Sequence, residues 1–238
     1  MKNMLAGDVQ AAELQVLAGG GIAGPLRELA AQFERASGQK LVLRFGTTPE
    51  LIKLATTGGP FDLGVVPRDV FKDAAAQARF APGPSTDVAR VGLGVAVRSG
   101  APKPDISTPE ALKQALLKAQ SIAAIPASAA GTQFLRICES LGISEAVKAK
   151  TKVQPAPAQV VEAVAKGEAE LGVFLINVLI APGLDVAGPI PAALQQEVVF
   201  TAALAASTRQ ADAAQAFITY LRTPAAAAIL KAKGMNPA

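Results

Sequence analysis

Residues 51–67 read LIKLATTGGPFDLGVVP, and residues 160–176 read VVEAVAKGEAELGVFLI. Each segment runs from an apolar helical pattern to a glycine, and then to an acidic residue followed by Leu-Gly-Val. The glycine and the acidic residue have the same spacing in both segments: Gly59 with Asp62, and Gly167 with Glu170. Because strand patterns flank both segments, we interpret them as one βαβ unit used once in each of two lobes. The alternative is a chance similarity between two helix-to-strand junctions.

Strand and helix patterns alternate along most of the chain. Short apolar runs predict strands at residues 13–19, 40–46, 61–67, 88–100, 121–127, 151–157, 169–176 and 198–206. Helical periodicity with start and stop signals predicts helices at residues 24–38, 48–59, 68–80, 107–116, 130–142, 158–167, 211–223 and 224–234. This order favours an α/β fold in which each lobe has a mostly parallel sheet flanked by helices.

The Pro- and Gly-containing start of residues 99–116 suits a crossover between the two halves of this plan. We therefore expect lobe 1 to contain residues 13–95 and 200–238, and lobe 2 to contain residues 96–199.

Composition excludes several classes of function. The chain has 238 residues, half of them apolar, and its net charge of +4 is scattered rather than gathered into a basic face, which argues against nucleic-acid binding. It contains no histidine, so histidine-based catalytic triads and metal sites are excluded. The single cysteine, Cys138, lies in a helical pattern and is expected to be buried and structural. No stretch approaches the roughly 20 apolar residues of a membrane helix, so no membrane insertion is expected.

The start of the chain, MKNMLAGDVQAAEL, has no apolar core of a signal peptide, because Asp8 falls where that core would lie. Two alternatives follow: a cytoplasmic protein, or a mature chain with a replaced start.

Residues 18–26 read AGGGIAGPL and join a predicted strand to a predicted helix. The glycines spell G-x-G-x-x-G, which is weak evidence for a dinucleotide site when it stands alone. Arg44, near the end of the second strand, suits the 2′-phosphate of NADP, but Pro25 is unusual directly after such a motif. The other interpretation is a small anion held by backbone N–H groups at a helix N-terminus. We expect the small anion.

Two further loops place small or hydroxyl residues at a predicted helix start. Thr47 and Thr48 follow the second strand, and Ser128, Gly131 and Thr132 follow a strand of the second half. Each hydroxyl on its own is typical of an ordinary helix N-cap. Three such loops at the carboxyl ends of strands, drawn from both lobes, favour convergence on one anion.

Residues 12–67, 88–123, 167–196 and 213–235, in this order and spacing, resemble periplasmic solute-binding proteins of the molybdate-binding type. These belong to the type II periplasmic binding protein superfamily, and the resemblance covers nearly the whole chain from Glu13. It implies two α/β lobes joined by two or three crossover strands, with a ligand cleft between them. It also implies a monomer that serves an ABC-transporter permease in the periplasm and needs no cofactor or metal.

The resemblance implies anion contacts from both lobes. The matching residues are Gly19, Gly20, Gly21, Thr47 and Thr48 in lobe 1, and Ser128, Gly131, Thr132, Ile176 and Asn177 in lobe 2. The first loop has glycines where molybdate binders have a serine, and Ile176-Asn177 stands where they often have a tyrosine. We therefore expect a wider cleft beside the glycines, which favours an organic carboxylate over molybdate. Arg68, at the end of the third strand, is a candidate for carboxylate recognition, or else a solvated arginine at a helix start.

The same superfamily includes an enzyme, aconitate isomerase, and this is the alternative function. Moving a double bond requires a base near the substrate carbon and cations for its carboxylates. Glu50 and Asp69 are the candidate bases, and Arg44 and Arg68 the candidate cations. Both acids have ordinary alternatives, as a first-turn helix acid and as a helix cap. We expect the binding protein rather than the enzyme.

Overall fold

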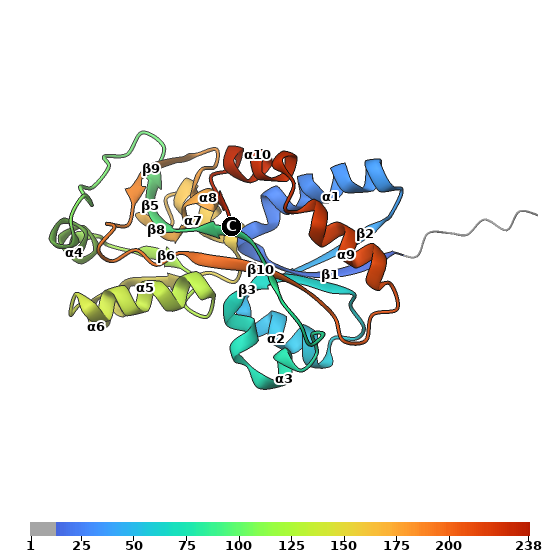
Figure 1. Cartoon of the computed structure of the whole chain (residues 1–238). Helices are drawn as coiled ribbons and strands as arrows, with labels where there is room; N and C mark the ends of the chain where they lie inside the picture. The colour runs from blue at the N-terminus through green and yellow to red at the C-terminus, as the bar shows by residue number, and fades with distance from the viewer. Residues whose placement is uncertain (1–12) are drawn as a thin grey trace, which may run out of the picture.

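The computed structural model describes residues 13–238, and the predicted absence of a signal peptide lies outside these residues. The described chain forms two sheets, each flanked by helices, which lie side by side and build two lobes (Figure 1). Strands of lobe 1 have the order β11-β4-β10-β3-β1-β2, and strands of lobe 2 the order β7-β6-β8-β5-β9.

The strands of lobe 1 are β1 (Leu14–Gly19), β2 (Leu41–Gly46), β3 (Leu63–Pro67), β4 (Thr86–Val91), β10 (Val198–Leu204) and β11 (Asn236–Pro237). Its helices are η1 (Gly20–Ile22), α1 (Ala23–Ser37), α2 (Thr48–Thr57), η2 (Arg68–Lys72), α3 (Ala74–Gln77), α9 (Ala211–Tyr220) and α10 (Pro224–Ala232). In lobe 2 the strands are β5 (Leu93–Arg98), β6 (Ile122–Ala124), β7 (Thr151–Val153), β8 (Leu171–Leu175) and β9 (Leu184–Pro189). Its helices are α4 (Pro109–Lys118), α5 (Ala129–Ser140), α6 (Ser144–Lys150), α7 (Pro157–Ala165) and α8 (Ile176–Leu179).

The βαβ plan appears in both sheets. Strand β1 pairs in parallel with β2 and β3, and β6 pairs in parallel with β7 and β8. Antiparallel strands complete each sheet, namely β10, β4 and β11 in lobe 1 and β5 and β9 in lobe 2. Both sheets are therefore mixed, with a parallel part that carries the loops of interest.

The two repeated segments have matching structural roles. Their strands, β3 and β8, lie in different sheets. The Asp62 carboxylate accepts a hydrogen bond from the Gln15 backbone N–H at 2.8 Å, and the Glu170 carboxylate accepts one from the Gln120 N–H at 2.7 Å. Asp62 thus accepts a hydrogen bond from a residue of β1, and Glu170 accepts one from a residue just before β6. These are the first strands of the βαβ units in the two lobes.

The prediction of one long strand over residues 88–100 is wrong. The chain forms β4 and β5 there, and these strands belong to different sheets. Gly92 lies between them, and a Cβ on it would come within 2.6 Å of the Gln195 side chain. Gln195 accepts a hydrogen bond from the Leu93 N–H and donates one to the Leu93 carbonyl. Gly92 and residues 190–197 therefore form two adjacent crossings between the lobes.

Cys138 is fully buried in the apolar core of lobe 2, and this burial raises the pKa of its thiol to about 12. The prediction of a structural cysteine is confirmed. Within residues 13–238, no helix has the length and apolar character needed to cross a bilayer.

Candidate functional site

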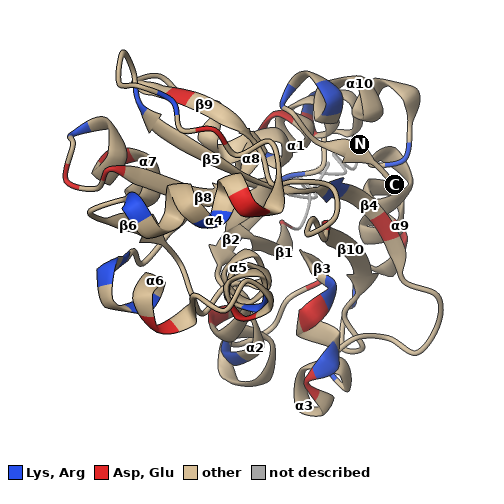
Figure 2. Ribbon diagram, turned by 90° about the vertical axis from the view of Figure 1, so that its left-hand side faces the viewer, with Lys and Arg blue, Asp and Glu red and all other residues tan. Residues whose placement is uncertain are grey.

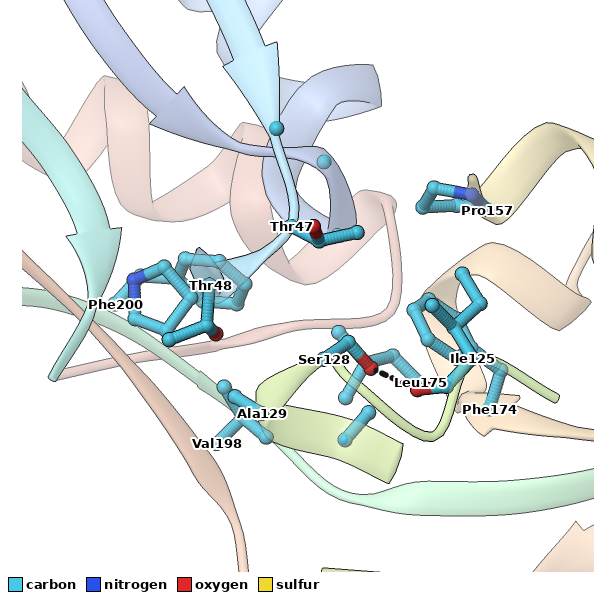
Figure 3. A pocket seen from close by; sticks show the side chains of 15 residues that line it. Thr47, Thr48, Ile125, Ser128, Ala129, Pro157, Phe174, Leu175, Val198 and Phe200 are labelled. Carbon is cyan, nitrogen blue, oxygen red and sulfur yellow. Dashed lines mark hydrogen bonds between the residues drawn. The ribbon is translucent and has the colours of Figure 1, made fainter. Parts of the chain in front are cut away.

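A small pocket lies where the two lobes meet, at the carboxyl ends of the parallel strands (Figure 3). Lobe 1 contributes Gly20, Gly21, Gly46, Thr47 and Thr48. Lobe 2 contributes Ser128, Ala129, Ala130, Pro157 and Leu175. The pocket has a volume of about 30 Å³ and is partly open to solvent. The five predicted residues Gly20, Gly21, Thr47, Thr48 and Ser128 are brought together here from both lobes.

Helix N-termini surround this pocket. Helix η1 follows β1, α2 follows β2 and α5 begins just after β6, so three helical starts face the space between the lobes. The first N–H groups of a helix have no acceptor inside it, and the aligned peptide dipoles make that end positive. No described residue that lines the pocket is charged. Among the described lining residues, backbone N–H groups and helix dipoles rather than cationic side chains are therefore available to a ligand.

Two of the hydroxyl groups at the pocket, those of Thr47 and Ser128, form hydrogen bonds within the protein. The Thr47 O–H donates to the Glu50 carboxylate at 2.8 Å, and the Thr47 N–H donates to the same oxygen at 2.7 Å. The Ser128 O–H donates to the Ile125 carbonyl at 2.8 Å, and its oxygen accepts from the Gly131 N–H at 3.0 Å. Thr47 and Ser128 are thus N-caps.

The Thr48 oxygen is buried and has no hydrogen-bond partner among residues 13–238. Figure 3 shows Thr48 beside Thr47, with Ser128 and Leu175 across the pocket. A buried hydroxyl without a hydrogen-bond partner destabilises the protein unless a ligand or a water molecule supplies that partner. Thr48 is therefore the hydroxyl that remains available to a ligand.

The expectation of a wider cleft beside the glycines is wrong. A Cβ on Gly21 would lie 2.3 Å from a Leu175 methyl group, and one on Gly19 would lie 2.6 Å from the Phe200 ring. A Cβ on Gly20 would lie 3.2 Å from the Pro157 ring. These apolar side chains occupy the room that the missing side chains leave, so glycine permits close approach of the two lobes.

Apart from Arg68, the other predicted ligand residues also lie outside the pocket lining: Gly19, Gly131, Thr132, Ile176 and Asn177. A Cβ on Gly131 would lie 1.9 Å from the Ile125 carbonyl oxygen, so this glycine serves the tight start of α5. Thr132 donates its O–H to the Ser128 carbonyl and lines a separate hollow. Asn177 donates its side-chain N–H to the Gly21 carbonyl at 2.9 Å and joins the lobes beside the pocket.

Arg68 also lies outside the pocket, at the edge of that separate hollow, and forms an ion pair with Asp87. Asp87 accepts a further hydrogen bond from the Thr201 hydroxyl at 2.8 Å. Burial of Asp87 opposes its ionisation, but the bonds from Arg68 and Thr201 outweigh burial and lower its pKa.

The candidate bases and the other candidate cation are engaged elsewhere. Glu50 accepts both bonds from Thr47, and Asp69 forms an ion pair with Lys72. Arg44 donates to the carbonyls of Gly58 and Pro60, at 3.0 Å in each case. Arg44 therefore fixes a loop of lobe 1.

Sequence reasoning missed the apolar wall of the pocket. Its members include Pro67, Ile125, Phe174, Leu175, Val198 and Phe200. Pro67 ends a predicted strand, and Phe174 and Leu175 lie within two residues of the end of another, which is the one signal that marks them. In the sequence these residues look like ordinary core residues. Only the packing of the two lobes against each other brings them to the pocket.

Comparisons with known proteins agree with this fold. The family model described as bacterial extracellular solute-binding protein matches residues 14–236. An aconitate isomerase of Pseudomonas sp is 35% identical over 232 residues, covering 94% of this chain and 87% of that protein. The molybdate-binding protein ModA of Azotobacter vinelandii is 28% identical over 234 residues, covering 97% of this chain and 92% of that protein. Among solved structures, the periplasmic molybdate-binding protein of Azotobacter vinelandii matches with a TM-score of 0.78 at 22% identity, covering 93% of this chain and 98% of that one.

Proposed function

This chain belongs to the bacterial extracellular solute-binding protein family, and we propose that it captures a small anion between its lobes for an ABC transporter. The observation that carries the proposal is the buried, unpartnered Thr48 hydroxyl in a pocket surrounded by helix N-termini. An anion would accept hydrogen bonds from this hydroxyl and from first-turn N–H groups of both lobes. Binding then consists of hinge closure around the ligand, with no covalent step.

Two classes of anion fit these donors: a compact oxyanion of the molybdate type, and the carboxylate group of an organic acid. Both are small, carry several acceptor oxygens and can be held by neutral donors. The relatives whose names point to these classes are the molybdate-binding protein and the aconitate isomerase.

The proposed setting follows the family. We place the protein in the periplasm as a monomer that delivers its ligand to a membrane permease. The permease would supply the passage across the membrane.

A second candidate function is isomerisation of a small polycarboxylate, which the 35% identity to an aconitate isomerase favours. In such a reaction a base removes a proton from one carbon, the double bond moves, and a proton returns at the far carbon. No oxidant or cofactor is consumed. The Glu50 carboxylate is bonded to the pocket residue Thr47, and it would have to exchange these bonds for the substrate proton.

Calorimetric titration of the purified protein tests the main proposal. Molybdate, tungstate, sulfate, phosphate, citrate, cis-aconitate, trans-aconitate and NADP are each titrated separately. Sub-millimolar binding of at least one small anion, with none for NADP, supports the proposal. Tight NADP binding, or no binding of any of these anions, contradicts it.

Proton NMR of trans-aconitate in D2O separates the two functions. A binding protein leaves the carbon-bound protons and the isomer ratio unchanged over hours. An isomerase exchanges those protons and produces the cis isomer, and Glu50→Gln would then abolish the exchange while retaining an acceptor for the Thr47 bonds.

A further inference from the structure

A second hollow adjoins the anion pocket and shares Ala129 and Val198 with it. Its volume is about 180 Å³, several times that of the pocket itself. Lobe 1 contributes Arg68, Asp69 and Lys72, and lobe 2 contributes Thr132, Gln133 and Arg136 from α5. In Figure 2, charged residues mark both α5 and the segment that follows β3. The hollow is therefore an interlobe space, like the pocket, but with charged walls.

The acids around this hollow already have donors. Asp69 pairs with Lys72, Asp87 pairs with Arg68, and Glu197 accepts a bond from the Asn236 side chain at 3.1 Å. Arg136, in contrast, has no ion pair or hydrogen bond within the part of the chain that the structure describes. Arg68 uses only one of its terminal nitrogens, Nη2, on Asp87. The hollow thus has exposed guanidinium groups on opposite lobes with donors that are unused within residues 13–238, and a guanidinium group is suited to binding a carboxylate.

Gln133 supplies an independent sign of a ligand. Its side-chain oxygen is buried and has no hydrogen-bond partner among residues 13–238. A half-turn of the amide would present its NH₂ group, so the side chain can meet either a hydroxyl or a carboxylate of a ligand. Gln133 therefore has buried hydrogen-bonding capacity toward the hollow, as Thr48 has toward the pocket.

Helix α5 connects the two spaces. Ser128, its N-cap, and Ala129 line the pocket, whereas Thr132, Gln133 and Arg136 line the hollow further along the same helix. A compact tetrahedral oxyanion at the start of α5 fills one space only. An organic acid with two or three carboxylates can place one group at the helix start and another against the guanidinium groups.

We propose that Arg136 and Gln133, facing Arg68 across the hollow, form a second carboxylate subsite that selects a di- or tricarboxylate over a compact oxyanion. This inference rests on the proposed function, because the first carboxylate occupies the anion pocket. It applies equally to a transporter component and to an isomerase, since both must hold the remote carboxylate.

The test is calorimetric titration of citrate, trans-aconitate, acetate and molybdate into the wild-type protein and Arg136→Gln. We expect the variant to lose about tenfold to a hundredfold in affinity for the two tricarboxylates, the range for one hydrogen bond between charged groups. Its affinity for any anion without a second carboxylate should stay within about twofold. Arg209→Gln is the matched control, because Arg209 is exposed, as Arg136 is, and carries the same charge but lines neither space.

The outcomes separate this inference from the proposed function. Unchanged tricarboxylate affinity in Arg136→Gln overturns the second subsite and leaves the anion pocket standing. So does a wild-type protein that binds molybdate but neither tricarboxylate. A wild-type protein that binds none of the anions overturns both. Equal losses in Arg136→Gln and Arg209→Gln would show a general charge effect and also overturn the subsite.

Discussion

At the scale of single residues, the Thr48 hydroxyl makes no hydrogen bond that would stabilise the fold within residues 13–238, so its proposed role lies in ligand binding. Its oxygen is buried beside the helix start without a hydrogen-bond partner in the described part of the chain, so it contributes a desolvation cost to the protein without ligand. Residues that serve folding make their bonds inside the chain, as Thr47 and Ser128 do. The unpartnered hydroxyl is the sign of a group kept for a ligand.

We expect Thr48→Val to lower affinity for the cognate anion by about tenfold or more, because one hydrogen bond to a charged ligand is lost. The melting temperature of the empty protein should stay equal or rise, since the isosteric side chain removes an unsatisfied polar atom. Calorimetry and thermal unfolding measure the two effects. Thr48→Ser, which keeps the hydroxyl, serves as the control, and equal affinities in all three proteins would remove Thr48 from the site.

Gly21 in η1 and Gly24 in α1 form a matched pair for testing how closely the lobes pack. A Cβ on Gly21 meets the Leu175 methyl at 2.3 Å, whereas a Cβ on Gly24 has no atom within 4 Å. Gly21→Ala should weaken ligand affinity and destabilise the protein by about 1–3 kcal/mol through overpacking between the lobes. Gly24→Ala should stabilise it by up to about 1 kcal/mol, because alanine has the higher helix propensity. Urea unfolding of both variants measures the difference, and a stable Gly21→Ala with full affinity would contradict the close lobe contact.

At the scale of elements, an ion pair ties three neighbouring strands together. Asp87 on β4 accepts bonds from Thr201 on β10 and from Arg68, which directly follows β3. These strands lie side by side in the sheet of lobe 1. The pair therefore holds the end of β3, where the loop toward the second hollow begins.

Because the folded state lowers the Asp87 pKa, this carboxylate contributes stability above its unfolded pKa of about 3.8. That contribution is lost as the pH falls through the lower, folded pKa. Asp87→Asn should therefore be less stable than wild type at pH 7, and the difference should shrink below about pH 4. Urea unfolding across pH 2–7 measures the curve, and a difference that is constant with pH would contradict the ion-pair account.

At the scale of the whole molecule, the lobes are closed on each other. Close contacts from Gly20 to Pro157 and from Gly21 to Leu175 join them at the pocket. Asn177 adds a hydrogen bond from lobe 2 to the Gly21 carbonyl, at 2.9 Å. Opening by rotation about Gly92 and residues 190–197 would break these contacts and expose the helix N-termini.

Asn177→Ala should shift the ligand-free protein toward an open form, since it removes the side-chain bond between the lobes. Small-angle X-ray scattering should show a larger radius of gyration without ligand and a wild-type value at saturating ligand. The ligand should also dissociate several-fold faster in the variant. Identical scattering and dissociation rates for the two proteins would show that Asn177 does not control closure.

The sequence alone determined most of the elements and the positions of the loops, although it merged β4 with β5 and missed α6, α8 and β9. Helical and strand periodicity depend on neighbours within a few residues, so the βαβ order, the repeated unit and the N-cap Ser128 could be predicted directly. At the second helix the N-cap is Thr47, one residue before the predicted Thr48. The burial of Cys138 could also be predicted from the sequence. A single cysteine on the apolar face of a helix, in a chain without histidine, has few other roles. The lobe boundaries at residues 13–95 with 200–238 and 96–199 stay a prediction, although the strands change sheet at Gly92 and between β9 and β10.

Only the tertiary structure decided which loop residues face the ligand space. Arg68 and Thr132 follow the right strand ends, yet their side chains turn to the second hollow, and Gly131 serves the tight start of a helix. Leu175 and Phe200, which fill the room beside the glycines, come from strands far along the chain. The physical reason is that contact between the lobes depends on shape and rotation about the crossings, and neither leaves a local pattern in the sequence.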